Sequence, residues 1–273
     1  QYQSVVIEDI PDLVVDVDND IPFTNTTQQH TYALIIGNED YSTYQTGLSS
    51  EVNVDYALND ARVFKTYCRK TLGIPEKHIK LLPNATYGQM SQGLAWLQNL
   101  AEVEGGKAEL IFYYSGHGLP DEQTKEGYLI PVDISGSNVQ SGIALKKVFR
   151  DLNKFPSEKA TVFLDACFSG GARNQGLGAM KGIRVKPREE SISGNMVVFT
   201  SSSGDESSAV YSEKQHGYFT YFLLKKLQDT KGTATYKELS DYVNYQVKKE
   251  TGLSGKIQTP QVNASSQAAD KWE

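Results

Sequence analysis

Short hydrophobic runs alternate along the chain with longer segments in which hydrophobic residues recur every three or four positions. The run at residues 31–36 has the length of a buried strand, whereas residues 54–69 place Ala57, Ala61 and Phe64 on one face of a helix. Strands that are regularly separated by helices form a mostly parallel sheet. The pattern therefore predicts an α/β fold with helices on both faces of the sheet.

The predicted elements extend over most of the chain. Strands are predicted at residues 31–36, 78–82, 110–114, 128–131, 161–165 and 196–201. Helices are predicted at residues 54–69, 87–103, 145–152, 218–228 and 236–249. No hydrophobic run approaches the roughly 18 residues that a membrane-spanning helix needs, so no membrane span is expected.

Residues 1–29 differ from the rest of the chain because they carry acids but neither Lys nor Arg. Their acids are Glu8, Asp9, Asp12, Asp16, Asp18 and Asp20. The whole chain has a net charge of −6, so the remainder is close to neutral. We expect an acidic arm or linker at residues 1–29, with one edge strand at residues 4–7. The negative charge argues against nucleic acid or an anionic membrane as the main partner.

The chain has 2 cysteines, Cys68 and Cys167. They cannot form a disulfide framework, and no Cys or His cluster has the spacing of a zinc site. Cys68 lies on the hydrophobic face of the helix predicted at residues 54–69, where we expect a buried small side chain. No metal or other cofactor is therefore expected to be required.

Two predicted strands end in residues that can carry out nucleophilic catalysis. His117, which precedes Gly118, follows the strand at residues 110–114, and Cys167 follows the strand at residues 161–165. Both side chains are expected at the edge of the sheet where the carboxyl ends of parallel strands meet. A cysteine thiolate is a nucleophile, and a nearby imidazole transfers protons. The backbone N–H groups of Gly118 and Cys167 are expected to form an oxyanion hole.

His117 precedes Cys167 by 50 residues, which is the order and spacing of caspases and not of papain. Other motifs are LNDARVF at 58–64, YYSGHG at 113–118, DACFSGG at 165–171, VVFTSSSGDESS at 197–208, HGYFTYFLLKKL at 216–227 and QTPQ at 258–261. Together these motifs resemble the caspase-like cysteine peptidases of clan CD, family C14, specifically the bacterial type of the metacaspase, orthocaspase and paracaspase branch. The resemblance implies an endopeptidase with Cys167 as nucleophile and His117 as general acid and base.

The resemblance also implies a caspase-like, three-layer fold around a mostly parallel six-stranded sheet. It divides the chain into a large-subunit-like region at residues 30–180, an inter-subunit loop at 181–194 and a small-subunit-like region at 195–273. These parts are expected to form one compact domain that follows the acidic arm. Protein or peptide substrates are the expected partners, and a monomer is the expected state.

Substrate specificity is implied by the acids near the predicted nucleophile. Caspases that cleave after Asp have Gln two residues before the catalytic Cys, whereas this chain has Asp165 there, as in metacaspases that bind a P1 Arg or Lys. The resemblance places Asp60 and Ser115 in the same S1 pocket and suggests Asp205 or Glu206 as a third acid. The planar guanidinium group suits such a carboxylate pair. As alternatives, Asp60 is a surface acid on a helix and Asp165 a structural acid.

The stretch between Asp165 and Glu189 contains basic residues but no acid. The basic residues are Arg173, Lys181, Arg184, Lys186 and Arg188, whereas the first basic residue of the whole chain is Arg62. In similar enzymes this loop is where self-cleavage occurs, and an exposed basic segment suits an enzyme that cuts after Arg or Lys. A solvated basic loop without such a role is the alternative.

Calcium activates many metacaspases through acids, one of which is expected shortly after the Cys motif. The residue at that point is Asn174, and Asp121, Glu122 and Asp133 show no recognisable calcium-loop pattern, so calcium dependence is doubtful. Three further histidines, which lie in the arm, at a strand start and at a helix start, are expected to have surface or structural roles. These are His30, His78 and His216.

Two alternatives to a basic-specific peptidase stay open. One is a caspase-like protease that prefers an acidic P1 residue, and the other is a catalytically silent caspase-fold binding module. The intact pair His117 and Cys167 argues against the second. The chain begins with Gln1 and not with Met, which favours a secreted or periplasmic location over a cytoplasmic one.

Overall fold

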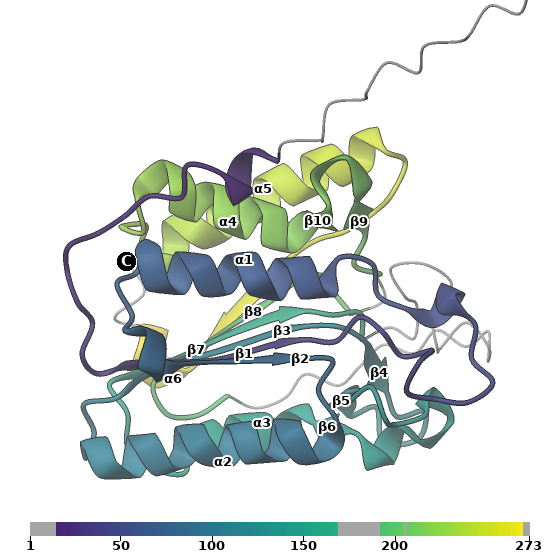
Figure 1. Ribbon diagram of the computed structural model, residues 1–273, viewed down its shortest axis with the longest axis horizontal. Helices are drawn as coiled ribbons and strands as arrows, with labels where there is room; N and C mark the ends of the chain where they lie inside the picture. The colour runs from purple at the N-terminus through teal and green to yellow at the C-terminus, as the bar shows by residue number, and fades with distance from the viewer. Residues whose placement is uncertain (1–14, 169–191, 205, 270–273) are drawn as a thin grey trace, which may run out of the picture.

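A six-stranded sheet forms the centre of the molecule (Figure 1). The computed structural model describes residues 15–168, 192–204 and 206–269. The strands are arranged in the order β11-β8-β7-β3-β1-β2, with β11 antiparallel to β8 and the other neighbours parallel. Their bounds are β1 (Thr31–Gly37), β2 (Ile79–Pro83), β3 (Glu109–Ser115), β7 (Lys159–Asp165), β8 (Met196–Thr200) and β11 (Gln261–Ala264).

Helices cover both faces of this sheet, as Figure 1 shows. On one face lie α1 (Ala57–Lys70), α4 (Tyr218–Thr230) and α5 (Tyr236–Leu253). On the other lie α2 (Tyr87–Glu104) and α3 (Leu145–Leu152), and the short helix α6 (Ser266–Ala269) follows β11. The predicted three-layer α/β fold with a mostly parallel six-stranded sheet is confirmed.

The alternation of side chains along β1 explains why two separate cores form. Ile35 packs in the core beneath α1 and α4, whereas Leu34 and Ile36 pack in the core beneath α2 and α3. Successive side chains of a strand point to opposite faces, so a strand buried on both faces is hydrophobic throughout. Gly37 ends β1 against α1, where a Cβ atom would lie 2.6 Å from the carbonyl oxygen of Ala57.

The strand predicted at residues 128–131 is observed at residues 127–129, and hydrophobic spacing predicted neither β11 nor the other short elements. Three short strands form a small sheet, namely β4 (Gly118–Pro120), β5 (Gly127–Leu129) and β6 (Ile143–Ala144), and two form a hairpin, namely β9 (Val210–Tyr211) and β10 (His216–Gly217). Short 3-10 helices occur at Asp16–Asp18, Ser50–Val52, Glu76–His78, Gly136–Ser141 and Ser212–Lys214. Segments this short carry too few residues for a periodic signal. The edge strand expected at residues 4–7 lies outside the described residues.

Residues 15–22, which we call the N-terminal brace, differ from the expected arm or linker because they pack against α1 and α4. Val15 and Val17 are buried in the core beneath these helices. The Tyr67 hydroxyl donates to the carbonyl of Val17 at 2.9 Å, and Gln228 Nε2 donates to the carbonyl of Asp16 at 3.0 Å. The sequence favours a linker because the two buried valines alternate with acids, so the segment has no hydrophobic run.

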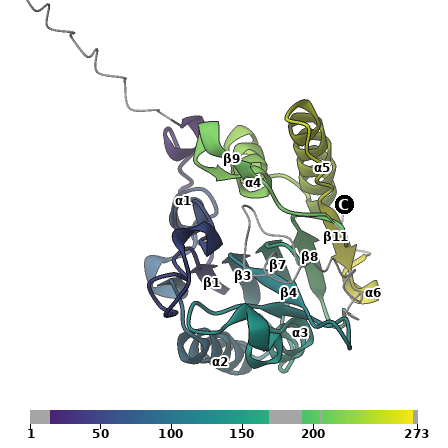
Figure 2. The ribbon, with the colours of Figure 1, turned by 90° about the vertical axis from the view of Figure 1, so that its right-hand side faces the viewer.

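The two smaller sheets lie near the edge of the central sheet where its parallel strands end, which faces the viewer in Figure 2. In the described residues, no helix combines the length and the apolar character needed to cross a bilayer.

Candidate active site

The pairing of β3 with β7 brings the predicted His and Cys to neighbouring positions. Ser115 and Asp165 are partners in this parallel register, and His117 and Cys167 each follow their strand by two residues. The Gly116 N–H donates to the carbonyl of Asp165 at 3.3 Å, which holds the two chain segments together just beyond the strands. Both predicted residues therefore lie at the carboxyl edge of the sheet, as expected for parallel strands.

The segments that carry the predicted His and Cys also pack closely against each other. A Cβ atom on Gly118 would lie 2.6 Å from the ring of Phe168, which is closer than such atoms can approach. A side chain at position 118 would therefore require Phe168, the neighbour of Cys167, to move. The predicted oxyanion hole at Gly118 and Cys167 stays a prediction.

Two kinds of contact fix His117. Its ring Nε2 lies 2.6 Å from the carbonyl oxygen of Val52, and its backbone N–H donates to the Tyr41 hydroxyl at 3.0 Å. The Tyr114 hydroxyl donates to the carbonyl of His117 at 2.7 Å. Because a carbonyl only accepts, Nε2 carries a hydrogen, and the proton that a neutral ring can take up goes to Nδ1. The buried tyrosines keep their hydroxyl hydrogens because burial raises the pKa of Tyr41 and of Tyr114.

Cys167 is 4% exposed and contacts the loop that follows β8. The Ser208 N–H donates to its Sγ at 2.8 Å, and its Sγ lies 3.6 Å from the Ser208 carbonyl oxygen. The Ser201 hydroxyl contacts that of Ser208 and donates to the carbonyl of Ala166 at 3.2 Å. The sulfur is therefore positioned by both backbone groups of Ser208.

Gln258, from the QTPQ motif, fixes the loop that contacts Cys167. Its side-chain oxygen accepts the N–H of Ala209 at 2.8 Å, and its Nε2 donates to the carbonyl of Ser201 at 2.8 Å. Gln258 is buried, so both polar ends of its side chain must be paired. The motif therefore supports the site through the backbone of residues 201–209.

Asp60, one of the predicted S1 acids, is fully buried at the same edge. Its Oδ2 accepts from the Ser115 hydroxyl at 3.0 Å, so the structure brings these two predicted S1 residues together. Its Oδ1 accepts from His216 Nδ1 at 2.8 Å and from the Gly217 N–H at 3.2 Å. The alternative of a surface acid on a helix is wrong for Asp60.

Asp165, the second predicted S1 acid, is also fully buried. Its Oδ2 accepts from the Thr220 hydroxyl at 2.7 Å and from the Thr220 N–H at 3.3 Å. The Tyr113 hydroxyl contacts that of Thr220 at 2.6 Å. Gly217 and Thr220 belong to the N-terminal end of α4, where unpaired N–H groups and the helix dipole favour negative charge. The N-terminal end of α4 therefore supports both predicted S1 acids.

His216 differs from the expectation for a surface histidine. It is fully buried and lies between Asp60 and Asp18, with Nε2 2.8 Å from the Asp18 Oδ1. Burial opposes its charge, but the hydrogen bonds to Asp18 and Asp60 and their negative charges outweigh burial and raise the pKa of His216 to about 9. His30 is an exposed partner of Glu104, as expected of a surface histidine.

Sequence reasoning missed the groups that hold the predicted residues. The carbonyl of Val52 and the N–H of Ser208 are backbone groups, which leave no trace in residue identity. The sequence did contain one indication for His216. Like His117, it precedes a glycine, and Gly217 stands immediately before α4. A second indication was the surplus of acids in residues 1–29, which need cationic partners if any of them are buried.

The remaining predicted site residues either fall outside the described part of the chain or have other partners. Asp205 and the self-cleavage candidates Arg173, Lys181, Arg184, Lys186 and Arg188 lie outside the described residues, as does Asn174. Glu206 instead accepts the Thr259 N–H at 2.6 Å. Asp121 accepts hydrogen bonds from Thr124, Gln140 and Gln123, which lower its pKa to about 2, and Asp133 accepts the Tyr87 N–H at 2.8 Å. Among the described residues, no group of three or more His, Cys, Asp or Glu side chains is arranged to hold a metal ion.

Cys68 provides an internal contrast to Cys167. It is fully buried in the core on α1, as predicted, and burial raises the pKa of its thiol. A thiol held in its protonated form is a poor nucleophile.

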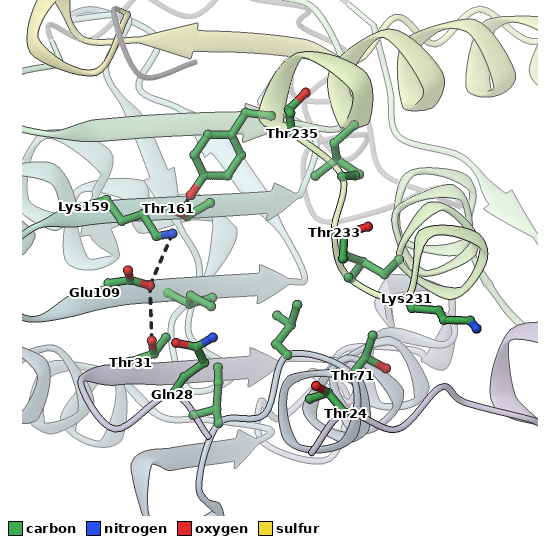
Figure 3. A pocket seen from close by; sticks show the side chains of 18 of the residues that line it. Thr24, Gln28, Thr31, Thr71, Glu109, Lys159, Thr161, Lys231, Thr233 and Thr235 are labelled. Carbon is green, nitrogen blue, oxygen red and sulfur yellow. Dashed lines mark hydrogen bonds and ion pairs between the residues drawn. The ribbon is translucent and has the colours of Figure 1, made fainter. Parts of the chain in front are cut away.

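A separate cavity of about 480 Å³ lies at the opposite edge, where the parallel strands begin (Figure 3). At one side of it Glu109 accepts from Lys159 at 3.2 Å and from Thr31 at 3.2 Å. Its other lining residues include several threonines and the rings of Phe64, Phe163 and Tyr236. Of the predicted catalytic and S1 residues that the structure describes, none lines this cavity.

Comparisons with known proteins agree with the predicted fold. Residues 30–271 match the sequence profile of the caspase domain, Peptidase_C14. Similar solved structures include protein GSU0716 from Geobacter sulfurreducens, with a TM-score of 0.61, 14% identity and coverage of 86% of this chain and 93% of that chain. They also include caspase-1 from Spodoptera frugiperda, with a TM-score of 0.52, 13% identity and coverage of 90% of both chains. The chain matches no curated protein.

Proposed function

Because the chain belongs to the caspase-domain family of cysteine peptidases, we propose that it is an endopeptidase that cleaves after Arg or Lys. The observation that carries this proposal is the pair of buried carboxylates, Asp165 and Asp60, at the sheet edge that also carries His117 and Cys167. Among the described residues, the one buried cation at this point is His216, which is already paired with Asp60 and Asp18. A basic P1 side chain complements the two buried carboxylates.

In the first half of the proposed reaction, the thiolate of Cys167 attacks the carbonyl carbon of the scissile peptide bond. The carbon–sulfur bond forms while the carbonyl oxygen takes the negative charge, which the N–H groups of Gly118 and Cys167 stabilise. The C–N bond then breaks as His117 gives a proton to the leaving amine. The products of this step are the free amine and a thioester on Cys167.

In the second half, water attacks the thioester while His117 takes a proton from the water. The carbon–sulfur bond breaks, the acid product leaves, and the sulfur returns to its starting state. Nδ1 of His117 is the nitrogen that exchanges the proton, because the hydrogen on Nε2 is held by the carbonyl of Val52 at 2.6 Å. This contact keeps the ring in one orientation throughout the cycle.

A panel of peptides that differ only at P1 tests the proposal. We expect hydrolysis after Arg and Lys, and little or none after Asp or norleucine, with wild-type protein. Cys167→Ala should be inactive on every peptide while its circular dichroism spectrum stays unchanged. Faster cleavage after Asp would contradict the proposed specificity, and activity in Cys167→Ala would contradict the proposed nucleophile.

Self-processing belongs to the same proposal. The candidates Arg173, Lys181, Arg184, Lys186 and Arg188 follow Cys167 in sequence and have the side chains that the S1 acids complement. The first basic residue is Arg62, so this specificity provides no cleavage point at residues 1–61, and the N-terminal brace should stay attached.

Intact-mass measurement of freshly purified wild type and Cys167→Ala tests self-processing. Two fragments that join between residues 167 and 193, found in wild type alone, are the expected result. Fragments of the same mass in Cys167→Ala would assign the cut to another protease. A fully active wild type that remains uncut would show that cleavage is not required.

A further inference from the structure

A continuous series of hydrogen bonds leads from the N-terminal brace to an S1 acid. Asp18 Oδ1 and Asp60 Oδ1 lie 2.8 Å from opposite ring nitrogens of His216. Asp60 Oδ2 in turn accepts from the Ser115 hydroxyl at 3.0 Å. Asp18 lies outside residues 30–271, which match the caspase domain, so the first member of this series is an addition to the family domain.

The geometry fixes the charge of His216. Both ring nitrogens face carboxylate oxygens, which accept hydrogen bonds but do not donate them, so both nitrogens must carry hydrogens. The ring is therefore an imidazolium between two carboxylates. The raised pKa of about 9 agrees with this conclusion. A buried cation with two anionic partners is satisfied only while both partners stay in place.

We propose that His216 is a positioning residue for recognition of the P1 side chain, and that Asp18 of the N-terminal brace holds His216 in place. This inference rests on the proposed function, because it assigns His216 and Asp18 to the support of the S1 acid Asp60. The imidazolium fixes one oxygen of Asp60, and the other accepts from the Ser115 hydroxyl at 3.0 Å. The imidazolium also limits the repulsion between the buried carboxylates.

The N-terminal brace is anchored well enough for this role. Besides the buried valines, the Gln228 side chain donates to the carbonyls of Asp16 and Asn19, at 3.0 and 2.9 Å. Asn59 Nδ2 lies 3.5 Å from Asp18 Oδ2 and therefore supports the same carboxylate from α1. Asp18 is thus held from two elements.

Asp16 lies in the same turn as Asp18 but contacts a different set of groups. It accepts from Lys214 at 3.2 Å, pairs with Lys225 at 3.3 Å and accepts from the Tyr221 hydroxyl at 3.1 Å. Among the described residues, Glu39 is a further acid near Asp60, and its pKa is raised by burial and by the charges of Asp55 and Asp60. Asp16 therefore provides a matched control for Asp18.

Two substitutions of His216 separate its two hydrogen bonds. The amide nitrogen of Asn can replace the Nδ1 donor that faces Asp60, whereas that of Gln can replace the Nε2 donor that faces Asp18. We expect His216→Gln to lower kcat/KM for a P1-Arg peptide by about 10- to 100-fold, mostly through KM, because a buried carboxylate loses a charged donor. His216→Asn should lower kcat/KM by a smaller factor, since its amide can still donate to Asp60.

Asp18→Asn and Asp16→Asn complete the series. Asp18→Asn should lower kcat/KM for the P1-Arg peptide by about 3- to 10-fold, as expected for a group that acts through another. Asp16→Asn should leave it unchanged. Cleavage of a P1-norleucine peptide, however slow, and alkylation of Cys167 by iodoacetamide should be the same in all four variants and in wild type.

The outcomes separate this inference from the proposed function. Equal losses on both peptides, or an unchanged His216→Gln, would overturn the positioning role while leaving cleavage after Arg intact. Equal losses in Asp18→Asn and Asp16→Asn would overturn the role of Asp18. A wild type that cuts neither P1-Arg nor P1-Lys would overturn the proposed function and, with it, the role in P1 recognition.

Histidine NMR gives a readout that does not depend on peptidase activity. In wild type, one imidazole should remain doubly protonated up to about pH 8, above the usual range for histidine. Its signal should be absent from His216→Gln, and in Asp18→Asn it should lose its proton at lower pH. If every histidine of the wild type loses its second proton by about pH 7, the proposed ion cluster is wrong.

Discussion

His117 and His216 are both buried, both precede a glycine and both lie near the carboxyl edge of the sheet, yet their partners differ in charge. The ring of His117 contacts the neutral carbonyl oxygen of Val52 at 2.6 Å. The ring of His216 lies between the carboxylates of Asp18 and Asp60, each at 2.8 Å. The carbonyl fixes the hydrogen on Nε2 of His117, whereas the two carboxylates hold the hydrogens on both ring nitrogens of His216.

The comparison shows that the partners of a histidine decide whether it can transfer protons or can hold a buried carboxylate in place. A proton-transfer residue must gain and lose a proton at neutral pH, and the contacts of His117 permit this. A residue that supports a buried acid must keep its charge, and the contacts of His216 ensure this. Substitutions that remove one histidine or the other should therefore produce losses of different kinds.

The largest expected effect is at the predicted catalytic pair. His117→Asn should lower kcat by about 10³-fold or more on P1-Arg and P1-norleucine peptides alike, because proton transfer serves every substrate. Cys167→Ala should be inactive, and Cys68→Ala is the matched control that should retain activity. If His117→Asn lost activity on P1-Arg peptides alone, His117 would act in P1 recognition, as proposed for His216, and not in proton transfer.

The second-largest effect is expected from substitution of Asp165, the predicted S1 acid two residues before Cys167. Asp165→Asn should lower kcat/KM for a P1-Arg peptide by about 10²- to 10³-fold, because an ion pair in a desolvated pocket loses one partner. The P1-norleucine peptide should be much less affected. Asp151→Asn, a change at a buried acid on α3, is the matched control. Equal losses on both peptides would mean that Asp165 supports the strand and does not recognise P1.

Protein stability should reveal the charge of His216. Folding raises its pKa from 6.5 to about 9, so the folded protein keeps a proton that the unfolded chain releases between these values. The resulting stabilisation, about 3 kcal/mol, is complete below the lower pKa and is lost as the pH rises through the higher one. Urea titrations measure the free energy of unfolding of wild type and His216→Gln. The difference between the two proteins should decrease by about this amount as the pH rises from about 6 to 10. A constant difference in the free energy of unfolding would show that His216 is not an imidazolium.

The smallest expected effect is at Tyr41, which contacts His117 but no carboxylate of the S1 cluster. Tyr41→Phe leaves the buried N–H of His117 without its hydroxyl acceptor, which should lower the free energy of unfolding by about 1 to 2 kcal/mol. Activity on P1-Arg and P1-norleucine peptides should fall a few-fold and equally. Tyr44→Phe, at an exposed tyrosine, should change neither stability nor activity. A selective loss on P1-Arg peptides would connect Tyr41 with P1 recognition.

Five strands of the central sheet and its long helices could be predicted from their hydrophobic patterns. The edge strand β11 was not predicted, because three of its four residues are exposed. The helix predicted at residues 145–152 is α3, and the other predicted helices end within a few residues of the observed bounds. The strand at residues 118–120 could not be predicted, because three residues carry no periodicity. The packing of the N-terminal brace was not predicted, because two valines among acids have the composition of a solvated linker.

The site could be predicted as far as residue type and strand position determine it. Asp60 and Ser115 were assigned to one pocket from motifs alone, and their side chains are hydrogen bonded. His216 and Asp18 could not be assigned, because their pairing depends on how a turn at residues 16–18 packs against the hairpin before α4. Such pairings arise from tertiary packing and are absent from local sequence.

The central claim is that Cys167 is the nucleophile of a site that recognises a basic P1 side chain. Labelling with a peptidyl chloromethyl ketone that carries Arg at P1, followed by mass spectrometry of the digested protein, tests both parts at once. We expect one label, on Cys167, that forms much faster than with the matching P1-Asp reagent and is slowed in Asp165→Asn. A label on Cys68, or faster labelling by the P1-Asp reagent, would contradict the account.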